Sequence, residues 1–384
     1  MAHVDNLRRY FPAVRDTTYL DTGSFGLLPE SCVTVMKDAL TWQLEKGRIT
    51  DNYLDELQKI KEAVREQLSQ LFHAREDCFT LTDSTAHGVN IVLNGLSLEF
   101  GDEVVVTDVE HPSVLLPIFN QKRRRHISVR IASALHGPDA LCANVESLIN
   151  SRTRLIVVSH VSCLTGLRLP IEQLTKIAHH HRILILIDGE QGIGTEPLDL
   201  NGLGCDFYSF PGQKWLCAPD GTGALYIKKE IQSMLDLTYV GQTSLQDLQS
   251  YSLAGDFTSA YHAKRYEHSS TNLASWKGFY ESLQMLRNIV GFDYAYTRVN
   301  GLTRTVMDEL FEFTNVSVIT PREHRGGLVH FRVRDRDVFE IANLLQTRQI
   351  VVKPIPKTNT IRVSPHFYNS EDDILRLTNT LKNI

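Results

Sequence analysis

Two side chains that could hold a cofactor follow two apolar segments of the chain. Residues 183–187 form an apolar run that ends abruptly in Asp188 and Gly189. Such a run is typical of a strand buried on both faces of a parallel sheet, and ligands bind at the carboxyl ends of these strands. A second short strand, predicted over residues 206–210, leads into a tight loop that carries Lys214. We therefore expect the Asp188 carboxylate and the Lys214 amine to face one crevice.

This pair of groups meets the chemical needs of pyridoxal phosphate. A carboxylate keeps the ring nitrogen of that cofactor protonated, and a lysine holds its aldehyde as a Schiff base until a substrate displaces it. A desolvated lysine can then act as a base on the substrate α-carbon. Taken singly, Asp188 could be a turn residue and Lys214 a solvated loop cation. Their combination with Gln191, three residues after the acid, favours the cofactor site.

The elements that must position these groups can be predicted from apolar patterning. Helical spacing of apolar residues extends over residues 51–72, and a helix is also expected near residues 139–149. The segment after residue 272 is predicted to order as helix, helix, strand, strand, helix, strand, helix, which indicates a separate α+β layer. Short strands, the last of them antiparallel, are predicted at residues 78–81, 101–108, 126–133, 153–162, 183–187, 206–210 and 221–228.

Six short motifs follow one another along the chain, at residues 110–112 (EHP), 159–161 (SHV), 188–191 (DGEQ), 212–215 (GQKW), 265–267 (RYE) and 362–369 (RVSPHFYN). With these motifs the chain resembles the class V aminotransferase family of pyridoxal phosphate enzymes from about Tyr19 to its C-terminus. That family includes cysteine desulfurases, selenocysteine lyases, isopenicillin N epimerases and cysteine/cystine C–S lyases.

The resemblance implies an α/β architecture, the pyridoxal phosphate transferase fold type I. A mostly parallel seven-stranded sheet is expected in a large cofactor-binding domain, residues 19–260. A smaller domain would combine an N-terminal arm, residues 1–18, with the C-terminal α+β layer, residues 261–384.

A phosphate cup is expected where a helix begins after the strand at residues 78–81. Free N–H groups at such a start suit a phosphate, and the resemblance assigns this role to Ser84, Thr85 and Ala86. A simple capping role for Ser84 or Thr85 is the alternative. Ala86 stands where the family usually has a threonine. The loop before Lys214 also departs from the family, with Pro211 in place of serine or threonine and Gln213 in place of histidine.

The resemblance also assigns residues to the cofactor ring and to a second subunit. His111 is expected to stack on the pyridine ring. Gln191 would contact the ring hydroxyl alone, because Cys163 stands where relatives often have an asparagine. Ser270 would replace the usual threonine on the phosphate of a partner subunit, so a homodimer is implied by the resemblance only.

Substrate contacts are expected from both ends of the chain. The planar guanidinium of Arg362 suits an α-carboxylate, with a surface ion pair as the alternative. Ser24 and Phe25 lie between two glycines in a segment that borders the substrate in relatives. A plain turn would explain these glycines equally well.

The absence of a suitable cysteine guides the expected reaction. Desulfurases of this family place a cysteine on a small-domain loop, since a thiolate must attack the substrate sulfur. This sequence has no cysteine after Cys217. We therefore expect β-elimination, in which Lys214 removes the α-proton and a sulfur leaving group departs from the β-carbon, giving pyruvate and ammonia. The segments 21–29, 230–260 and 238–244 most resemble the cysteine/cystine C–S lyases, so the expected substrates are cystine, a cysteine S-conjugate or its sulfoxide.

Other functions stay open at this point. An epimerase or an aminotransferase would begin from the same carbanion, and a cysteine desulfurase is a weaker alternative. A catalytically silent interaction module would tolerate the altered phosphate cup. Against it stand the intact cofactor and substrate residues His111, Asp188, Gln191, Lys214 and Arg362.

Composition excludes several other classes of partner. The net charge of −5 and the pI near 6.3 give no reason to expect nucleic acid or an anionic membrane. The consecutive histidines at residues 179–181 point about 100° apart on a helix and cannot converge on a metal. Six irregularly spaced cysteines, with no signal-peptide core and no apolar run of about 18 residues, indicate a reduced cytoplasmic enzyme.

Overall fold

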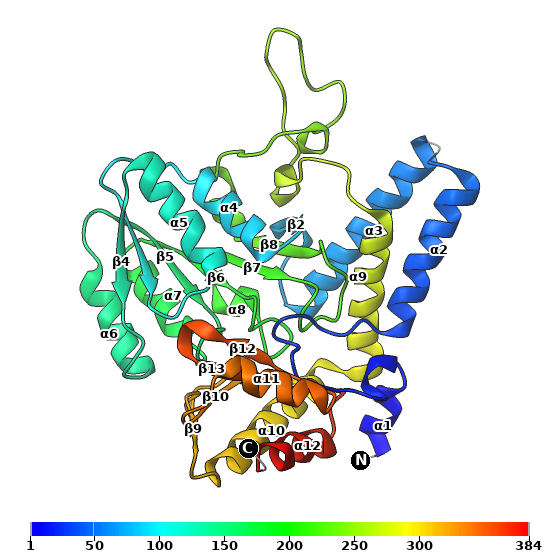
Figure 1. Ribbon diagram of the computed structural model, residues 1–384. Helices are drawn as coiled ribbons and strands as arrows, with labels where there is room; N and C mark the ends of the chain where they lie inside the picture. The colour runs from blue at the N-terminus through cyan, green and yellow to red at the C-terminus, as the bar shows by residue number, and fades with distance from the viewer. Residues whose placement is uncertain (1, 49, 383–384) are drawn as a thin grey trace.

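A seven-stranded sheet forms the centre of the larger part of the molecule (Figure 1). The computed structural model describes residues 2–48 and 50–382. The strands are β2 (Phe79–Thr82), β3 (Glu103–Thr107), β4 (Ser128–Ala132), β5 (Thr153–Ser159), β6 (Leu184–Asp188), β7 (Phe207–Pro211) and β8 (Gly223–Ile227). Their order is β2-β8-β7-β6-β5-β3-β4, and β8 alone runs antiparallel to its neighbours. The mostly parallel sheet expected from the sequence is confirmed, although β2 rather than β8 forms its edge.

Helices cover both faces of this sheet because its strands are apolar on both sides. Val104 and Val106 pack with α4 and α5 on one face, whereas Val105 belongs to the cluster on the other face with α3, α6 and α7. The helices α2 and α9 pack against each other, and α9 also packs against α3. The bounds are α2 (Glu30–Lys46), α3 (Thr50–Leu71), α4 (Thr85–Gly95), α5 (Pro112–Arg125), α6 (Pro138–Leu148), α7 (Ile171–His180), α8 (Leu200–Leu203) and α9 (Leu273–Met285).

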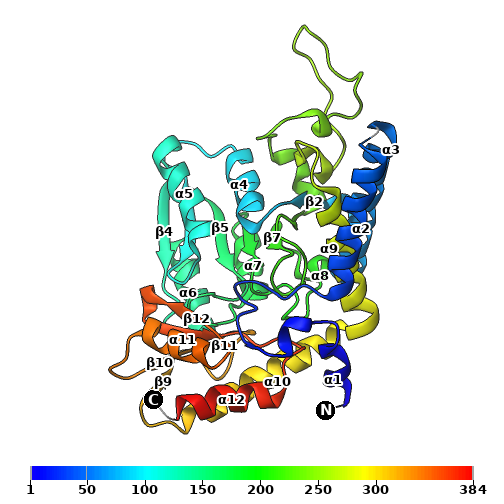
Figure 2. The ribbon, with the colours of Figure 1, turned by 45° about the vertical axis from the view of Figure 1, so that its right-hand side comes forward.

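A smaller α+β layer lies below the large sheet in Figures 1 and 2. Its antiparallel sheet has the order β12-β13-β10-β9. The expected order of elements holds, except that three short strands instead of one lie between the last two helices. The elements are α10 (Phe292–Phe311), β9 (Val316–Val318), β10 (Val329–Val333), α11 (Val338–Thr347), β11 (Ile350–Val351), β12 (Lys353–Ile355), β13 (Thr360–Val363) and α12 (Glu371–Leu381).

The N-terminal arm is attached to this smaller layer. It begins with helix α1 (Ala2–Arg8), and Arg8 forms an ion pair of 2.7 Å with Asp373 of α12. Strand β1 (Thr18–Tyr19) then pairs in parallel with β11. Because α9 packs on α2 and α3 rather than on this layer, the domain boundary at residue 261 stays a proposal.

A long segment between β8 and α9 projects away from the rest of the molecule in both views (Figures 1 and 2). Residues 245–259 fold back on themselves through isolated bridges between Leu245 and Ser259 and between Tyr251 and Phe257. After this segment in the chain, the buried Glu267 forms ion pairs with Lys61 and Arg65 of α3. Burial raises the pKa of Glu267, but these two cations lower it to about 2. The base of the projecting segment is thereby anchored to the core.

None of the helices in the described part of the chain is both long and apolar enough to cross a membrane.

Candidate functional site

The ends of two neighbouring parallel strands bring Asp188 and Lys214 to one site. Asp188 is the last residue of β6 and lies opposite Ser209 of β7 in the sheet register. The loop after β7 is held by hydrogen bonds from Gly212 N to Thr222 O (2.7 Å) and from Gly26 N to Gln213 O (2.8 Å). Asp188 is 3% exposed and Lys214 is 9% exposed. Both side chains therefore lie in an environment that excludes most water.

The Asp188 carboxylate lacks a cationic hydrogen-bond partner within the described residues. Its Oδ1 accepts a hydrogen bond of 2.8 Å from the backbone N–H of Glu190. Burial, followed by the charges of Glu190 and Glu110, raises the pKa of Asp188 well above its usual value. A protonated ring nitrogen would provide the positive charge that this buried carboxylate needs.

Glu190 is a further acidic group in the site, and its role could not be predicted from the sequence. Its Oε1 lies 2.9 Å from Lys214 Nζ, and its Oε2 lies 3.8 Å from His111 Nδ1. The second oxygen is buried and has no hydrogen-bond partner in the described part of the chain. The only available signal was the presence of an acidic side chain between Asp188 and Gln191.

His111 stands at the start of α5, beside this ion pair. Its Nδ1 accepts a hydrogen bond of 3.1 Å from Ser113 N and lies 2.9 Å from Ser113 Oγ. Burial is the main cause of a lowered pKa at His111, so the neutral imidazole is favoured at neutral pH. The preceding Glu110 is buried against β5, where its Oε2 accepts a 2.5 Å hydrogen bond from Ser159 Oγ. Stacking of His111 on a ring stays a prediction.

Gln191 connects three segments of the site. Its Nε2 donates to Gly23 O at 2.9 Å, and its Oε1 accepts from Trp215 Nε1 at 2.9 Å. Both ends of the amide are thus bonded within the protein. The expected contact with a ring hydroxyl would have to use the remaining N–H or the second oxygen lone pair.

The start of α4 contains one capping residue and one free hydroxyl. Ser84 is the N-cap, because its Oγ accepts a hydrogen bond of 3.2 Å from His87 N. The capping role expected as the alternative is thus observed, whereas a phosphate contact of Ser84 stays a prediction. Thr85 Oγ1 is buried without a hydrogen-bond partner in the described residues, and Ala86 follows it on the first turn. Thr85 and the free N–H groups of this turn remain available to a phosphate.

Gln213 and Ser270, two further residues assigned to the cofactor, have different surroundings. Gln213 has a buried Oε1 with no hydrogen-bond partner among the described residues. Ser270 lines a surface hollow of about 280 Å³ together with residues of α3 and of the projecting segment. None of the residues around that hollow belongs to the lysine loop. A phosphate contact by Ser270 within the same chain is therefore unsupported.

Arg362 joins the C-terminal layer to the N-terminal segment. Its Nη2 donates to Asp21 Oδ1 at 3.1 Å and to Ser24 Oγ at 2.6 Å, while its Nε is buried without a partner. The side chain is 6% exposed, which rules out the surface ion pair considered above. Phe25 is 54% exposed. Arg362 and Ser24 are thus brought together, and the Nε group remains free to bind an anion.

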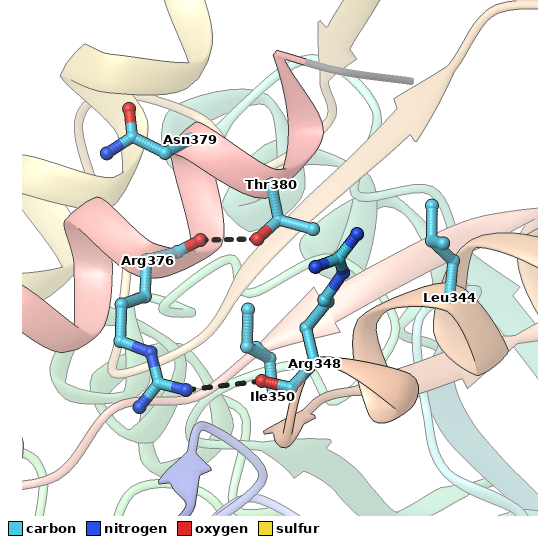
Figure 3. A pocket seen from close by; sticks show the side chains of 6 residues that line it. All are labelled: Leu344, Arg348, Ile350, Arg376, Asn379 and Thr380. Atoms are coloured by element: carbon cyan, nitrogen blue, oxygen red, sulfur yellow. Dashed lines mark hydrogen bonds between the residues drawn. The ribbon is translucent and has the colours of Figure 1, made fainter.

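A separate cavity of about 430 Å³ lies in the small layer, between α11 and α12 (Figure 3). Arg376 crosses it to donate a 3.2 Å hydrogen bond to the backbone oxygen of Arg348. Its other lining residues are Leu344, Ile350, Asn379 and Thr380. None of the predicted site residues is among them, so this cavity is distinct from the Asp188–Lys214 site. The described residues contain no cluster of three or more potential metal ligands.

The residues present fit pyridoxal phosphate at both ends of its ring. Asp188 is a buried carboxylate without a cation, Lys214 is a buried amine, and Thr85 is a free hydroxyl at a helix start. Glu190 departs from this fit, because its carboxylate already pairs with the Lys214 amine.

Comparisons with known proteins agree with this geometry. The profile of the Aminotransferase class-V family matches residues 18–377. A probable cysteine desulfurase from Methanothermobacter thermautotrophicus is 28% identical over 397 aligned positions, covering 99% of this chain and 98% of that protein.

Two solved structures of another protein, C-DES, resemble the whole chain. The cystine C–S lyase C-DES in complex with its reaction product cysteine persulfide has a TM-score of 0.92 at 26% identity, covering 97% of this chain and 99% of that chain. A C-DES mutant with glycine covalently linked to the PLP cofactor also has a TM-score of 0.92 at 26% identity, covering 98% and 99%. The expected fold class is confirmed, and the chain belongs to the class-V aminotransferase family of pyridoxal phosphate-dependent enzymes.

Proposed function

We propose that this protein is a pyridoxal phosphate-dependent carbon–sulfur lyase that acts by β-elimination. Its substrate would be a sulfur-substituted cysteine, namely cystine, a cysteine S-conjugate or its sulfoxide. The relatives support cleavage of a C–S bond in a cysteine-type compound, since one is named a probable cysteine desulfurase and another a cystine C–S lyase. The choice of elimination rests on the chemistry of the cysteines in this chain.

The cysteines of this protein are poor nucleophiles. All six are free thiols, and five of them are buried. Cys163 precedes the 164–166 turn after β5, and burial raises its pKa to about 12. Because the thiolate is the reactive form, such a thiol cannot efficiently attack a substrate sulfur at neutral pH. Cys32 and Cys78 have pKa values raised by burial to about 11 and about 12. This observation favours elimination over transfer of sulfur to the enzyme.

Each residue of the site would have a defined task in the elimination. Pyridoxal phosphate, when bound, supplies the electron sink for the carbanion that forms at the α-carbon. Asp188 would keep the ring nitrogen protonated, and the Lys214 amine would take the α-proton from the substrate. Arg362 would hold the α-carboxylate, so that the α-proton faces Lys214. Loss of the sulfur substituent from the β-carbon, followed by hydrolysis, would give pyruvate and ammonia.

A panel of substrates tests this proposal. The purified protein is incubated with cystine, cysteine S-conjugates, unsubstituted amino acids and cysteine, and pyruvate, alanine, keto acids and D-isomers are quantified in parallel. We expect pyruvate from cystine or an S-conjugate, with one ammonia per pyruvate. Alanine together with an enzyme-bound persulfide would instead identify a desulfurase. D-amino acids or keto acids from unsubstituted substrates would identify an epimerase or an aminotransferase.

Replacing Arg362 with lysine is expected to weaken substrate binding. Lysine keeps the positive charge but cannot form two parallel hydrogen bonds to a carboxylate. We expect KM to rise by about tenfold or more, the equivalent of one lost hydrogen bond to a charged group of about 1.5–3 kcal/mol, with a smaller change in kcat. Steady-state kinetics with cystine measure this effect. Arg332, which binds the backbone oxygens of Thr358 and Asn359 on the same sheet, provides a matched Arg→Lys control.

We also propose that the protein is a homodimer in the cytoplasm. The projecting segment exposes large apolar side chains, a feature typical of protein interfaces: Tyr239, Leu248, Tyr251, Leu253 and Phe257. In a dimer, Ser270 would lie near the phosphate of the partner subunit. Light scattering is expected to give twice the chain mass of 43.5 kDa, and a monomer at micromolar concentration would contradict the proposal. The free cysteines suit a reducing compartment.

A further inference from the structure

The Glu190 side chain runs between the two groups that would face opposite ends of the cofactor ring. Its backbone N–H binds Asp188 Oδ1 at 2.8 Å, and its carboxylate ends 2.9 Å from Lys214 Nζ. Asp188 would meet the ring nitrogen, and Lys214 would meet the aldehyde carbon on the far side of the ring. Glu190 therefore connects the two groups between which the ring would lie.

The charged groups around Glu190 hold its carboxylate in this position. Lys214 contacts one oxygen, His111 Nδ1 lies 3.8 Å from the other, and the positive charge of Arg362 also favours the carboxylate. Burial raises the pKa of Glu190, but the net shift is downward, because the charge and the hydrogen bond of Lys214, together with His111 and Arg362, lower this pKa. The carboxylate is thus ionised at neutral pH. A buried ion of this kind is tolerable only while it stays paired.

We propose that Glu190 is an internal plug of the cofactor site, whose carboxylate occupies Lys214 in the cofactor-free protein and must leave before the lysine can bind pyridoxal phosphate. The inference rests on the proposed function, because it concerns the attachment of the same cofactor. The hydrogen bond to Asp188 is donated by the backbone of Glu190 and not by its side chain. The side chain can therefore move away without breaking this hydrogen bond.

Glu190 can accept the proton that Lys214 must lose before its amine attaches to the cofactor. The Lys214 ammonium gives one proton to the Glu190 carboxylate, and the neutral amine attacks the aldehyde carbon. A carbon–nitrogen double bond forms, and the aldehyde oxygen leaves as water with the two remaining amine protons. The protonated Glu190 carboxyl group no longer has an ammonium partner, so its side chain leaves Lys214 after this proton transfer and before the amine attacks.

A plug of this kind lowers the apparent affinity for the cofactor. The apparent dissociation constant equals the intrinsic constant divided by the fraction of molecules in the open state. If about one molecule in ten is open, removing the plug tightens binding about tenfold. Glu190→Ala removes both the volume and the charge, whereas Glu190→Gln keeps the volume and removes the ion pair.

The experiment uses the full-length chain after its cofactor has been stripped with hydroxylamine. Pyridoxal phosphate is titrated into wild type, Glu190→Ala and Glu190→Gln, and Schiff-base formation is followed by absorbance. The modified lysine is identified by mass after borohydride reduction. In parallel, a low dose of acetic anhydride measures the accessibility of Lys214 without any cofactor. Thermal unfolding checks that each variant is folded.

We expect about tenfold tighter binding of pyridoxal phosphate in Glu190→Ala, a smaller gain in Glu190→Gln, and faster acetylation of Lys214 in both. Glu196→Gln is the matched control, because Glu196 is also buried and ion-paired, at 2.9 Å from Arg168, but does not pair with Lys214. Equal affinities and equal acetylation in wild type and both Glu190 variants would overturn the plug. Faster acetylation without any adduct at Lys214 would support the plug and overturn the proposed function instead.

Discussion

Lys214→Ala is expected to lower the rate of pyruvate formation from cystine by about 10²–10⁴-fold, the usual contribution of one acid–base group. The variant loses the amine that would take the α-proton, and it also loses the covalent attachment of the cofactor. Its absorbance with pyridoxal phosphate should lack the Schiff-base band, and borohydride should leave no adduct in the 212–215 loop. Cofactor content, absorbance and steady-state rates measure these effects.

Lys228→Ala is the control for this change. Lys228 follows β8, and its Nζ donates to Gly204 O at 3.2 Å, outside the proposed site. Its replacement should leave both the Schiff-base band and the rate within about twofold of wild type. Full turnover in Lys214→Ala would show that another group removes the α-proton, and the assignment of the whole site would then be wrong.

Asp188→Asn is expected to change activity and stability in opposite directions. The amide cannot keep the ring nitrogen protonated, so turnover should fall by about 10²–10³-fold, as when a preorganised electrostatic partner is removed. The cofactor-free variant should nevertheless unfold at a higher temperature. Its amide oxygen can still accept from Glu190 N, while the desolvation cost of a buried carboxylate charge that has no cationic hydrogen-bond partner disappears.

The stability gain should depend on pH in a defined direction. Burial raises the pKa of Asp188 in the folded chain above its unfolded value of about 3.9. The protonated form therefore stabilises the fold fully below that value, and this contribution is lost as the pH rises through the folded-state pKa. The difference in melting temperature between Asp188→Asn and wild type should be large at pH 7 and small near pH 4.

Asp206, a second buried aspartate, is the control for this substitution because it lies outside the proposed site. Its Oδ2 accepts a hydrogen bond of 2.9 Å from Ile185 N and lies 3.1 Å from His179 Nε2. Asp206→Asn removes a satisfied charge, so it should destabilise the cofactor-free protein. Added pyridoxal phosphate should stabilise wild type more than Asp188→Asn. A lower melting temperature for Asp188→Asn than for wild type would contradict the assignment of an uncompensated carboxylate.

The strand ends could be predicted from the sequence, because buried parallel strands leave a clear local pattern. The apolar run before Asp188 and the short strand before the lysine loop are neighbours in the sheet, as the rule for open α/β sheets requires. The pattern is weaker for β1 and β11, which have two residues each. Strands of this length show no alternation, so their pairing could not be predicted.

The interactions around the site were harder to predict because they join distant segments. Arg362 and Asp21 are 341 residues apart in the chain, and Gln191 and Gly23 are 168 residues apart. No periodicity links such pairs. The pairing of Glu190 with Lys214 depends on the relative height of two strand ends, which only the folded sheet defines. The sequence therefore identified the chemical groups but not which of them are partners.

The segment from residue 18 to residue 26 connects the smaller layer to the loop that carries Lys214. Its backbone N–H groups donate hydrogen bonds at both ends of this connection: Thr18 and Leu20 bond to the β11 region, Thr22 bonds to Ser364 after β13, and Gly26 bonds to Gln213. A movement of the smaller layer relative to the large sheet would therefore be transmitted through this segment to the loop that carries Lys214. Removal of residues 2–20 would thus break the connection to the smaller layer, although it leaves Ser24, Lys214 and Asp188 in the chain.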